Sequence, residues 1–186
     1  MDYLITPLKE LEEYKELIKG ILNYKAPLAV SGISDSQKAH ICHALSSYSN
    51  APGVFVAFNE MQARKFFEDF SFFLGDAAVF YPNKEIILYD VEAKSHDDVH
   101  QRLGALDRIL NNDFKIIVTS VEAISHKMLD PQIFGTFTME IESGQELNLD
   151  EIISKLVKIG YKRVHTVDTV GQFAVRGGII DIFSLA

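Results

Sequence analysis

Cysteine is nearly absent from this sequence: Cys42 is the single one among 186 residues. One cysteine excludes an internal disulfide and any zinc site built from several cysteines, so a reducing cytoplasm is the expected compartment. No apolar run reaches the ~18 residues that a membrane-spanning helix needs. The start, Met1-Asp2-Tyr3, also lacks the basic and apolar regions of a signal peptide. We therefore expect a cytoplasmic protein with no membrane partner.

Basic residues are outnumbered, 18 lysines and arginines against 26 aspartates and glutamates, so the net charge is −8. This balance argues against a general nucleic-acid-binding surface and leaves direct DNA binding as a weaker alternative. The charge is uneven, because the residues from Asp150 onward carry +1, which leaves −9 for residues 1–149. The less acidic C-terminal part suits an acidic protein partner.

Apolar residues make up 47% of the chain, which predicts a globular fold. Four short apolar stretches, each followed by a helical pattern, predict an α/β layer sandwich with a parallel sheet covered on both faces. An amphipathic helix is expected over 7–23, before the first strand. The expected strands are 28–32, 53–58, 77–82 and 115–119, and the helices are 36–48, 59–74 with Asn59 as N-cap, one carrying Val99, Leu103, Leu106 and Leu110, and 120–128.

The pattern changes at Asp130-Pro131, which predicts two domains, 1–130 and 131–186. The second is expected to be a small α+β unit with a strand over 137–142, a helix from Asn148 to Gly160, and strands over 162–167 and 172–183. In the last range, Gly177-Gly178 predicts a turn between two short strands. The given sequence stops three residues after Phe183, so we expect this sheet to be incomplete.

The loop after the first expected strand is the place where an α/β domain would hold a phosphate. Residues 32–39 have the length of the phosphate loop GxxxxGK[ST], and Gly32 and Lys38 match it. Gln37 replaces the second glycine, Ala39 replaces the hydroxyl residue that ligates Mg²⁺, and Asp35 adds a negative charge. We therefore predict a degenerate, non-functional loop, with a nucleotide-using enzyme that binds phosphate through Lys38 as the alternative.

Other residues that could carry chemistry lack the necessary context. The six histidines include the pair His96 and His100, four residues apart, without a third ligand or an HExxH motif, so a metal site is not expected. Ser34 and Ser36 have no GxSxG surroundings, and Cys42 lies on the apolar side of its helix. We expect no catalytic residue, no metal and no cofactor in this stretch of chain.

Four stretches together point to a family. They are the degenerate loop at 31–39, Val79-Phe80-Tyr81-Pro82 leading to Leu88-Tyr89-Asp90, Gly160-Tyr161-Lys162-Arg163, and the run FAVRGGIIDIF at 173–183. The chain resembles the N-terminal region of the bacterial transcription-repair coupling factors, the Mfd family, whose front end is similar to UvrB. UvrB keeps an intact phosphate loop, so Gln37 and Ala39 favour the Mfd family.

The resemblance implies a fold and a function. The first domain would be a vestigial helicase-like domain, and the appended unit would bind UvrA. The full-length protein would be an ATP-driven DNA translocase that removes stalled RNA polymerase and recruits UvrA. ATP, Mg²⁺, RNA polymerase and double-stranded DNA would be bound by downstream domains, so this segment is expected to be non-catalytic.

The resemblance also implies site residues. Arg163 and Arg176 match arginines with which UvrB-like modules contact UvrA, and Phe173 is a weaker third candidate. Ala174 stands where the UvrB pattern has a further arginine, so that contact is missing or replaced. A planar guanidinium on a rigid strand suits bidentate pairing with a carboxylate. The alternative is an exposed strand arginine without a partner.

Overall fold

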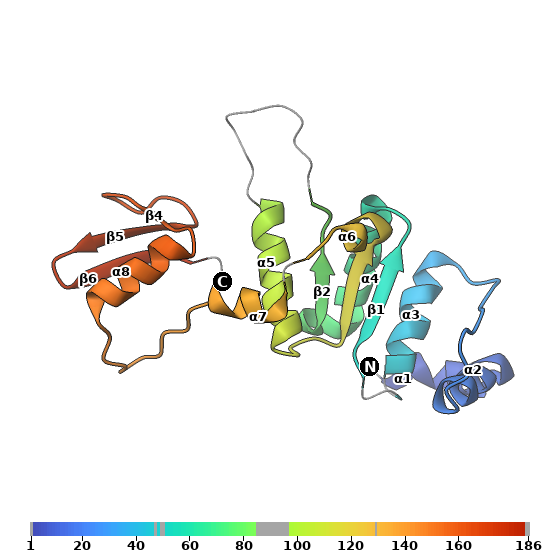
Figure 1. Cartoon of the computed structure of the whole chain (residues 1–186). Coiled ribbons are helices and arrows are strands. Elements are labelled where there is room, and N and C mark those ends of the chain that lie inside the picture. The colour runs from blue at the N-terminus through green and yellow to red at the C-terminus, as the bar shows by residue number, and fades with distance from the viewer. Residues whose placement is uncertain (1, 47, 49–50, 85–96, 129, 185–186) are drawn as a thin grey trace. The chain divides into compact units, whose positions relative to one another are not determined.

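The computed structural model describes residues 2–46, 48, 51–84, 97–128 and 130–184 (Figure 1). Leu88-Tyr89-Asp90 and His96 lie outside them. The chain forms two compact units, Met1–His126 and Lys127–Ala186, and each is described by itself. Within the described residues, no helix has the length and apolar character needed to cross a membrane.

The first unit contains a three-stranded parallel sheet, which confirms the α/β class and the parallel sheet. Its strands are β1 (Gly53–Ala57), β2 (Ala78–Tyr81) and β3 (Ile116–Ser120), in the spatial order β1-β3-β2. Their apolar side chains alternate between two cores. Phe80 packs on one side of the sheet against α4 (Glu60–Leu74), while Val79 packs on the other against α5 (Asp97–Leu110) and α6 (Val121–Ser125).

The predicted cover on both faces holds for β2 and β3 but not for β1. Every residue of β2 and β3 is buried, whereas Val54 and Val56 of β1 are exposed. Helix α5 buries only part of the expected stripe. Leu106 packs against the core beside buried Ala105, whereas Val99 and Leu110 are exposed.

Helix α4 forms where the sequence predicts it. The Asn59 side chain accepts a hydrogen bond from the Gln62 backbone N–H at 2.8 Å, which confirms the predicted N-cap. Helical spacing brings Phe66 and Phe70 to the sheet, where their rings lie 4.5 and 5.2 Å from that of Phe55.

The segment before the sheet differs from the prediction in two places. The helix expected over 7–23 is divided into the 3₁₀ helix η1 (Thr6–Glu10) and α2 (Glu12–Leu22), because Leu11 is extended and breaks the hydrogen-bond ladder. A short helix, α1 (Asp2–Ile5), precedes them. The strand expected over 28–32 is absent, and its apolar side chains Leu28 and Val30 are exposed. A strand needs a partner, and within the described residues β1 is bonded to β3 alone. Helix α3 (Asp35–Ser46) follows.

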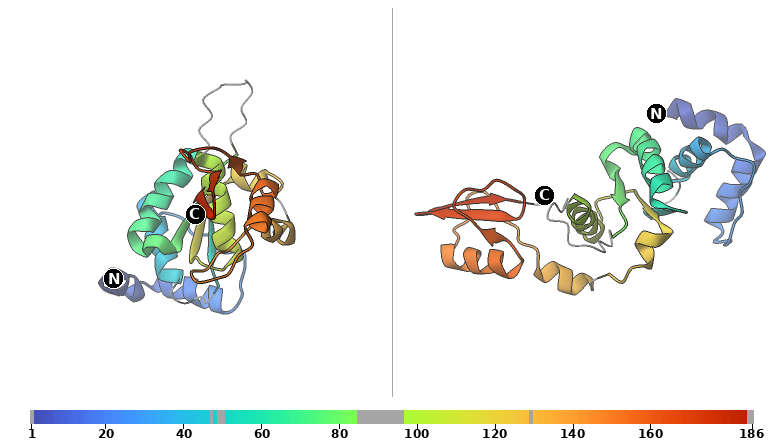
Figure 2. Two further views of the ribbon diagram at one scale, coloured as in Figure 1. Left: turned by 90° about the vertical axis from the view of Figure 1, so that its left-hand side faces the viewer. Right: turned by 90° about the horizontal axis from the view of Figure 1, so that it is seen from above.

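The second unit is a helix on a small mixed sheet. After the short helix α7 (Pro131–Thr136), helix α8 (Leu149–Lys158) lies against one face of the strands β4 (Lys162–Arg163), β5 (Gln172–Arg176) and β6 (Ile179–Phe183) (Figure 2). The spatial order is β4-β5-β6, with β4 parallel and β6 antiparallel to β5. Gly177 has φ +60°, as the predicted turn requires.

One expected strand of this unit is absent and another is shorter than predicted. Residues 137–142 alternate in the sequence but form no strand, and Ile141 is exposed, because the sheet takes its three strands from 162–183. The strand expected over 162–167 is two residues long. Asn148 does cap α8, accepting from the backbone N–H groups of Asp150 and Glu151 at 3.0 and 3.4 Å.

Candidate functional site

The loop at residues 32–39 satisfies its own hydrogen-bonding groups. The Ser34 backbone N–H donates to Gln37 Oε1 at 2.7 Å, and the Ser34 hydroxyl donates to the same oxygen at 3.1 Å. This is the reciprocal half of a capping box, in which a side chain three residues inside a helix binds back to the residue before it. The Gln37 side chain therefore helps to cap the N-terminus of α3. In a phosphate loop, this position is a glycine.

Lys38 and Ala39 are also used within the unit. The Lys38 ammonium lies 2.8 Å from Asp35 Oδ1, and this hydrogen bond and charge lower the pKa of the Asp35 carboxyl. Ala39 is fully buried in the core cluster that contains Phe66 and Phe70. A hydroxyl at position 39 would therefore point at apolar side chains and not at a metal-bound phosphate.

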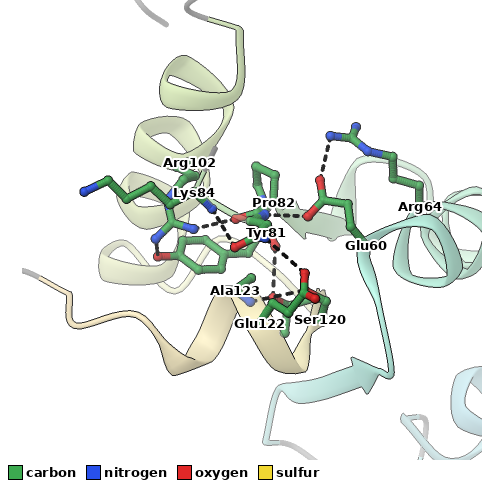
Figure 3. A network of polar contacts seen from close by, with 11 residues as sticks. Glu60, Arg64, Tyr81, Pro82, Lys84, Arg102, Ser120, Glu122 and Ala123 are labelled. Carbon is green, nitrogen blue, oxygen red and sulfur yellow. Dashed lines mark hydrogen bonds and ion pairs between the residues drawn. The ribbon is translucent and has the colours of Figure 1, made fainter. Parts of the chain in front are cut away.

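The carboxyl ends of the parallel strands are the second place where an α/β sheet binds ligands. Here they carry a network of polar contacts, drawn in Figure 3. Glu60 accepts from the Asn83 backbone N–H at 2.6 Å and pairs with Arg64 at 2.7 Å, while the Asn83 side chain donates to Glu122 at 3.1 Å. The network joins the start of α4, the exit of β2 and the start of α6.

Arg102 of α5 binds the end of β2 from the side of the sheet covered by α5. It donates to the Pro82 carbonyl at 2.5 Å and to the Tyr81 hydroxyl, and its guanidinium lies 4.2 Å from the centre of the Tyr81 ring. Burial raises the pKa of Tyr81, while the Arg102 charge acts in the opposite direction. Thr119 donates to the Tyr81 carbonyl at 2.9 Å. These contacts hold the end of β2 in place. They could not be predicted from the sequence, because Arg102 lies in a polar stretch typical of a solvent-facing helix.

Three other titratable residues, Cys42, His40 and His43, pack against apolar or aromatic side chains. Burial raises the pKa of the Cys42 thiol, which keeps it protonated and unreactive. The rings of His40 and His43 stack on Phe73 at 5.5 and 5.1 Å. Across the described part of the chain, no three His, Cys, Asp or Glu residues gather as a metal site would require.

Arg176 lies at the end of β5 and forms an ion pair with Asp181 of β6. The register places Arg176 opposite Ile179 and Asp181 opposite Ala174. Paired residues share a face of a sheet and alternate along each strand. Arg176, Asp181, Ile179 and Phe183 therefore belong to one face, called here the Arg176 face.

Three side chains of the Arg176 face are exposed to solvent, while Ala174, which lies on the same face opposite Asp181, is buried. The side chain of Arg176 is 70% exposed, and Ile179 and Phe183 are 63% and 45% exposed. The two apolar residues flank Asp181 along β6. They were not identified from the sequence, although the alternation of β6 around Asp181 was a sufficient signal for their position.

Arg163 and Phe173 lie elsewhere. They are register partners, so they share the face opposite to Arg176. Phe173 is fully buried, so any contribution of its side chain to binding is through packing of the sheet and stays a prediction. Arg163 is exposed on the two-residue edge strand β4. The structure does not bring the two arginines together.

Comparisons with known proteins identify relatives of this chain. The model of the UvrB interaction domain family matches residues 139–186, which include α8, the three-stranded sheet and the Arg176 face. The transcription-repair-coupling factor of Bacillus subtilis is 32% identical over all 186 residues, and that of Myxococcus xanthus is 31% identical over 161 residues. The chain is a relative of the transcription-repair coupling factors.

The relationship extends over the whole chain, since the factors of Staphylococcus aureus are also similar over all 186 residues, at 26% identity. The predicted resemblance to this family is thereby confirmed. The chain spans 16% of the length of the Bacillus subtilis relative and 13% of the Myxococcus xanthus relative.

Proposed function

We propose that this chain is the N-terminal, non-catalytic module of a transcription-repair coupling factor and that it recruits UvrA through the Arg176 face. The observation that carries the proposal is a 70% exposed arginine on a sheet strand, beside exposed Ile179 and Phe183, inside the region that matches the UvrB interaction domain. Interfaces commonly combine an arginine with apolar anchors in this way.

The chemistry of the Arg176 face favours an acidic protein partner. A guanidinium presents several N–H donors in a plane, which matches the two oxygens of a carboxylate. The nearby apolar side chains exclude water when a partner covers them, and the hydrogen bond to the carboxylate becomes stronger in that drier setting. Arg163 is proposed as a second contact, which requires a partner that reaches around the β4 edge.

We further propose a vestigial helicase-like domain over residues 1–130, which contains the first unit, followed by the UvrA-binding domain over 131–186. The capping role of Gln37, the Lys38–Asp35 ion pair and the buried Ala39 support a loop that no longer binds phosphate. Under this proposal, ATP hydrolysis with Mg²⁺, DNA translocation and contacts with RNA polymerase and double-stranded DNA belong to the rest of the relatives' length.

The test is the affinity of the chain for immobilised UvrA. We expect Arg176→Ala to weaken binding by about 10- to 100-fold, as truncation of an interface arginine does, and the wild-type affinity to fall as salt is raised. Lys158→Ala in the last turn of α8 removes an exposed charge from the same unit and is the matched control. Arg163→Ala reports whether the partner reaches the β4 edge.

Circular dichroism must show that each variant keeps its fold. Equal UvrA affinity for the folded Arg176→Ala variant and the wild type would exclude the Arg176 face as the site. Absence of UvrA binding by the wild-type chain would exclude the proposed function itself.

A further inference from the structure

The guanidinium of Arg176 is held in place before any partner arrives. Its Nη2 atom donates to Asp181 Oδ2 across the β5–β6 hairpin. Because Arg176 is opposite Ile179 and Asp181 is opposite Ala174, the two charged residues form a diagonal pair on one face. The residue directly opposite Asp181, Ala174, carries only a methyl group, which leaves room for the arginine to lean toward Asp181.

The ion pair contributes little to folding, because the side chains of Arg176 and Asp181 are 70% and 39% exposed. Its consequence for binding is larger. A free arginine side chain has many rotamers, and fixing one of them opposes association, so a side chain ordered beforehand binds more tightly. Asp181 lies between Ile179 and Phe183 along the same face of β6, so the guanidinium bound to it is on the same face as both exposed apolar side chains.

Asp181 also sets which partners are accepted. It offsets part of the charge of Arg176 and accepts a hydrogen bond, so an acidic partner that offers only a carboxylate gains less than one that also offers a hydrogen-bond donor. A surface with a carboxylate for Arg176 and an N–H or O–H donor for Asp181 satisfies both groups. Leaving either group without a partner in a closed interface costs affinity.

We infer that Asp181 is a positioning and specificity-determining residue of the Arg176 face, which thereby selects a protein surface carrying a carboxylate next to a hydrogen-bond donor. The identity of that protein as UvrA rests on the proposed function. The action of Asp181 on Arg176 is a property of the free chain and can be measured without UvrA.

The first measurement is nitrogen-15 relaxation of the Arg176 Nε–H group in the free 186-residue chain. We expect an ordered group in the wild type and a mobile one in Asp181→Asn, which keeps the shape of the side chain and removes its charge. Asp181→Glu keeps the carboxylate and should restore much of the order. Asp168→Asn makes the same charge change at an exposed position of the same unit and should leave the order unchanged. Equal order of Arg176 in wild type and Asp181→Asn would overturn the positioning role.

The second measurement is a double-mutant cycle on the rate of dissociation from immobilised UvrA. We expect Asp181→Asn to raise this rate about 3- to 10-fold in the wild-type background and by a clearly smaller factor in Arg176→Ala, where only the direct contact of Asp181 with the partner's donor is lost. An equal increase in both backgrounds would show that Asp181 acts independently of Arg176 and would overturn the inference. If the wild type does not bind UvrA, the proposed function fails, and the relaxation measurement alone decides the positioning role.

Discussion

Titration with Mg-ATP gives the sharpest test of the loop at residues 32–39. A ligand that binds only the folded state stabilises it by an amount set by its concentration and affinity. For a nucleotide site with a dissociation constant of about 50 μM, 5 mM ATP would stabilise the fold by about 2.7 kcal/mol. For a unit of the size of Met1–His126, this corresponds to a rise in melting temperature of roughly 8–10 °C. We expect a rise of less than about 1 °C.

The small expected shift follows from the contacts of the loop. A phosphate would have to displace Gln37 from the Ser34 amide and Asp35 from Lys38, whose bonds are 2.7 and 2.8 Å long. The Asp35 carboxylate would then face the phosphate with a like charge, and its lowered pKa keeps it ionised at neutral pH. The metal would also lack a hydroxyl ligand, because position 39 is an alanine whose side chain is buried in the core.

The assay is a thermal melt followed by circular dichroism, with Mg sulfate at matched ionic strength as the control. A saturable rise of several degrees that requires Mg²⁺ and disappears in Lys38→Ala would refute the reasoning and support the nucleotide-binding alternative. A small rise that persists in Lys38→Ala would show general ionic stabilisation.

Three further predictions concern stability. Phe70→Ala should lower the free energy of unfolding by about 3–5 kcal/mol because the ring is fully buried, whereas Phe72→Ala, 67% exposed on the same helix, should change it by less than about 0.5 kcal/mol in urea unfolding. Asn148→Ala removes the cap of α8 and should cost about 1 kcal/mol in the same assay. Burial, then the charges of His40 and Lys115, lower the pKa of His43. The unfolded chain therefore takes up the proton first, so stability should fall as the pH drops below about 6.5, and His43→Leu should flatten this dependence in melts from pH 8 to 5.

The elements that the sequence predicts well are those whose signal is local. Helix α4 follows from its helical spacing of apolar residues and from Asn59, and the β5–β6 hairpin follows from alternation around Gly177-Gly178. The caps at Asn59, Ser120 and Asn148 are formed by side chains two or three residues from their donors. Interactions over so few residues leave their pattern in the sequence.

The errors concern strands, whose stability depends on a distant partner. Residues 28–32 and 137–142 have strand-like sequences, but the structure gives neither a neighbour. Nothing within five or six residues can show whether a ladder will form. For the same reason, the exposure of Val54 and Val56 was not predictable, since it depends on where α5 and α6 lie relative to β1.

The candidate site was only partly predictable. The sequence and the family resemblance identified Arg176 as a cation in an apolar run, and the structure places it in solvent. The separation of Arg163 and Arg176 on opposite faces required the register of β4 and β5. The ion pair with Asp181 required the register of the hairpin, which a one-residue shift would have changed.

Lys38 and Arg176 each form an ion pair with a nearby aspartate, but the two pairs have different consequences. Each cation is paired with a nearby aspartate, and each was singled out as a ligand for an anion. Lys38 is bound within the first turn of α3, lies 5.9 Å from the centre of the Phe66 ring, and is followed by a residue of the core. A phosphate would therefore have to break a closed arrangement.

The pair of Arg176 and Asp181 lies instead on an open face with exposed apolar residues on both sides. The guanidinium uses one of its donors on Asp181 and has others for a partner, and the surrounding Ile179 and Phe183 gain by being covered. The Lys38–Asp35 pair thus occupies the lysine that a phosphate would need, whereas the Arg176–Asp181 pair leaves the arginine exposed to a partner. The difference lies in what surrounds each pair, and for that reason we place recruitment of a partner in the C-terminal sheet.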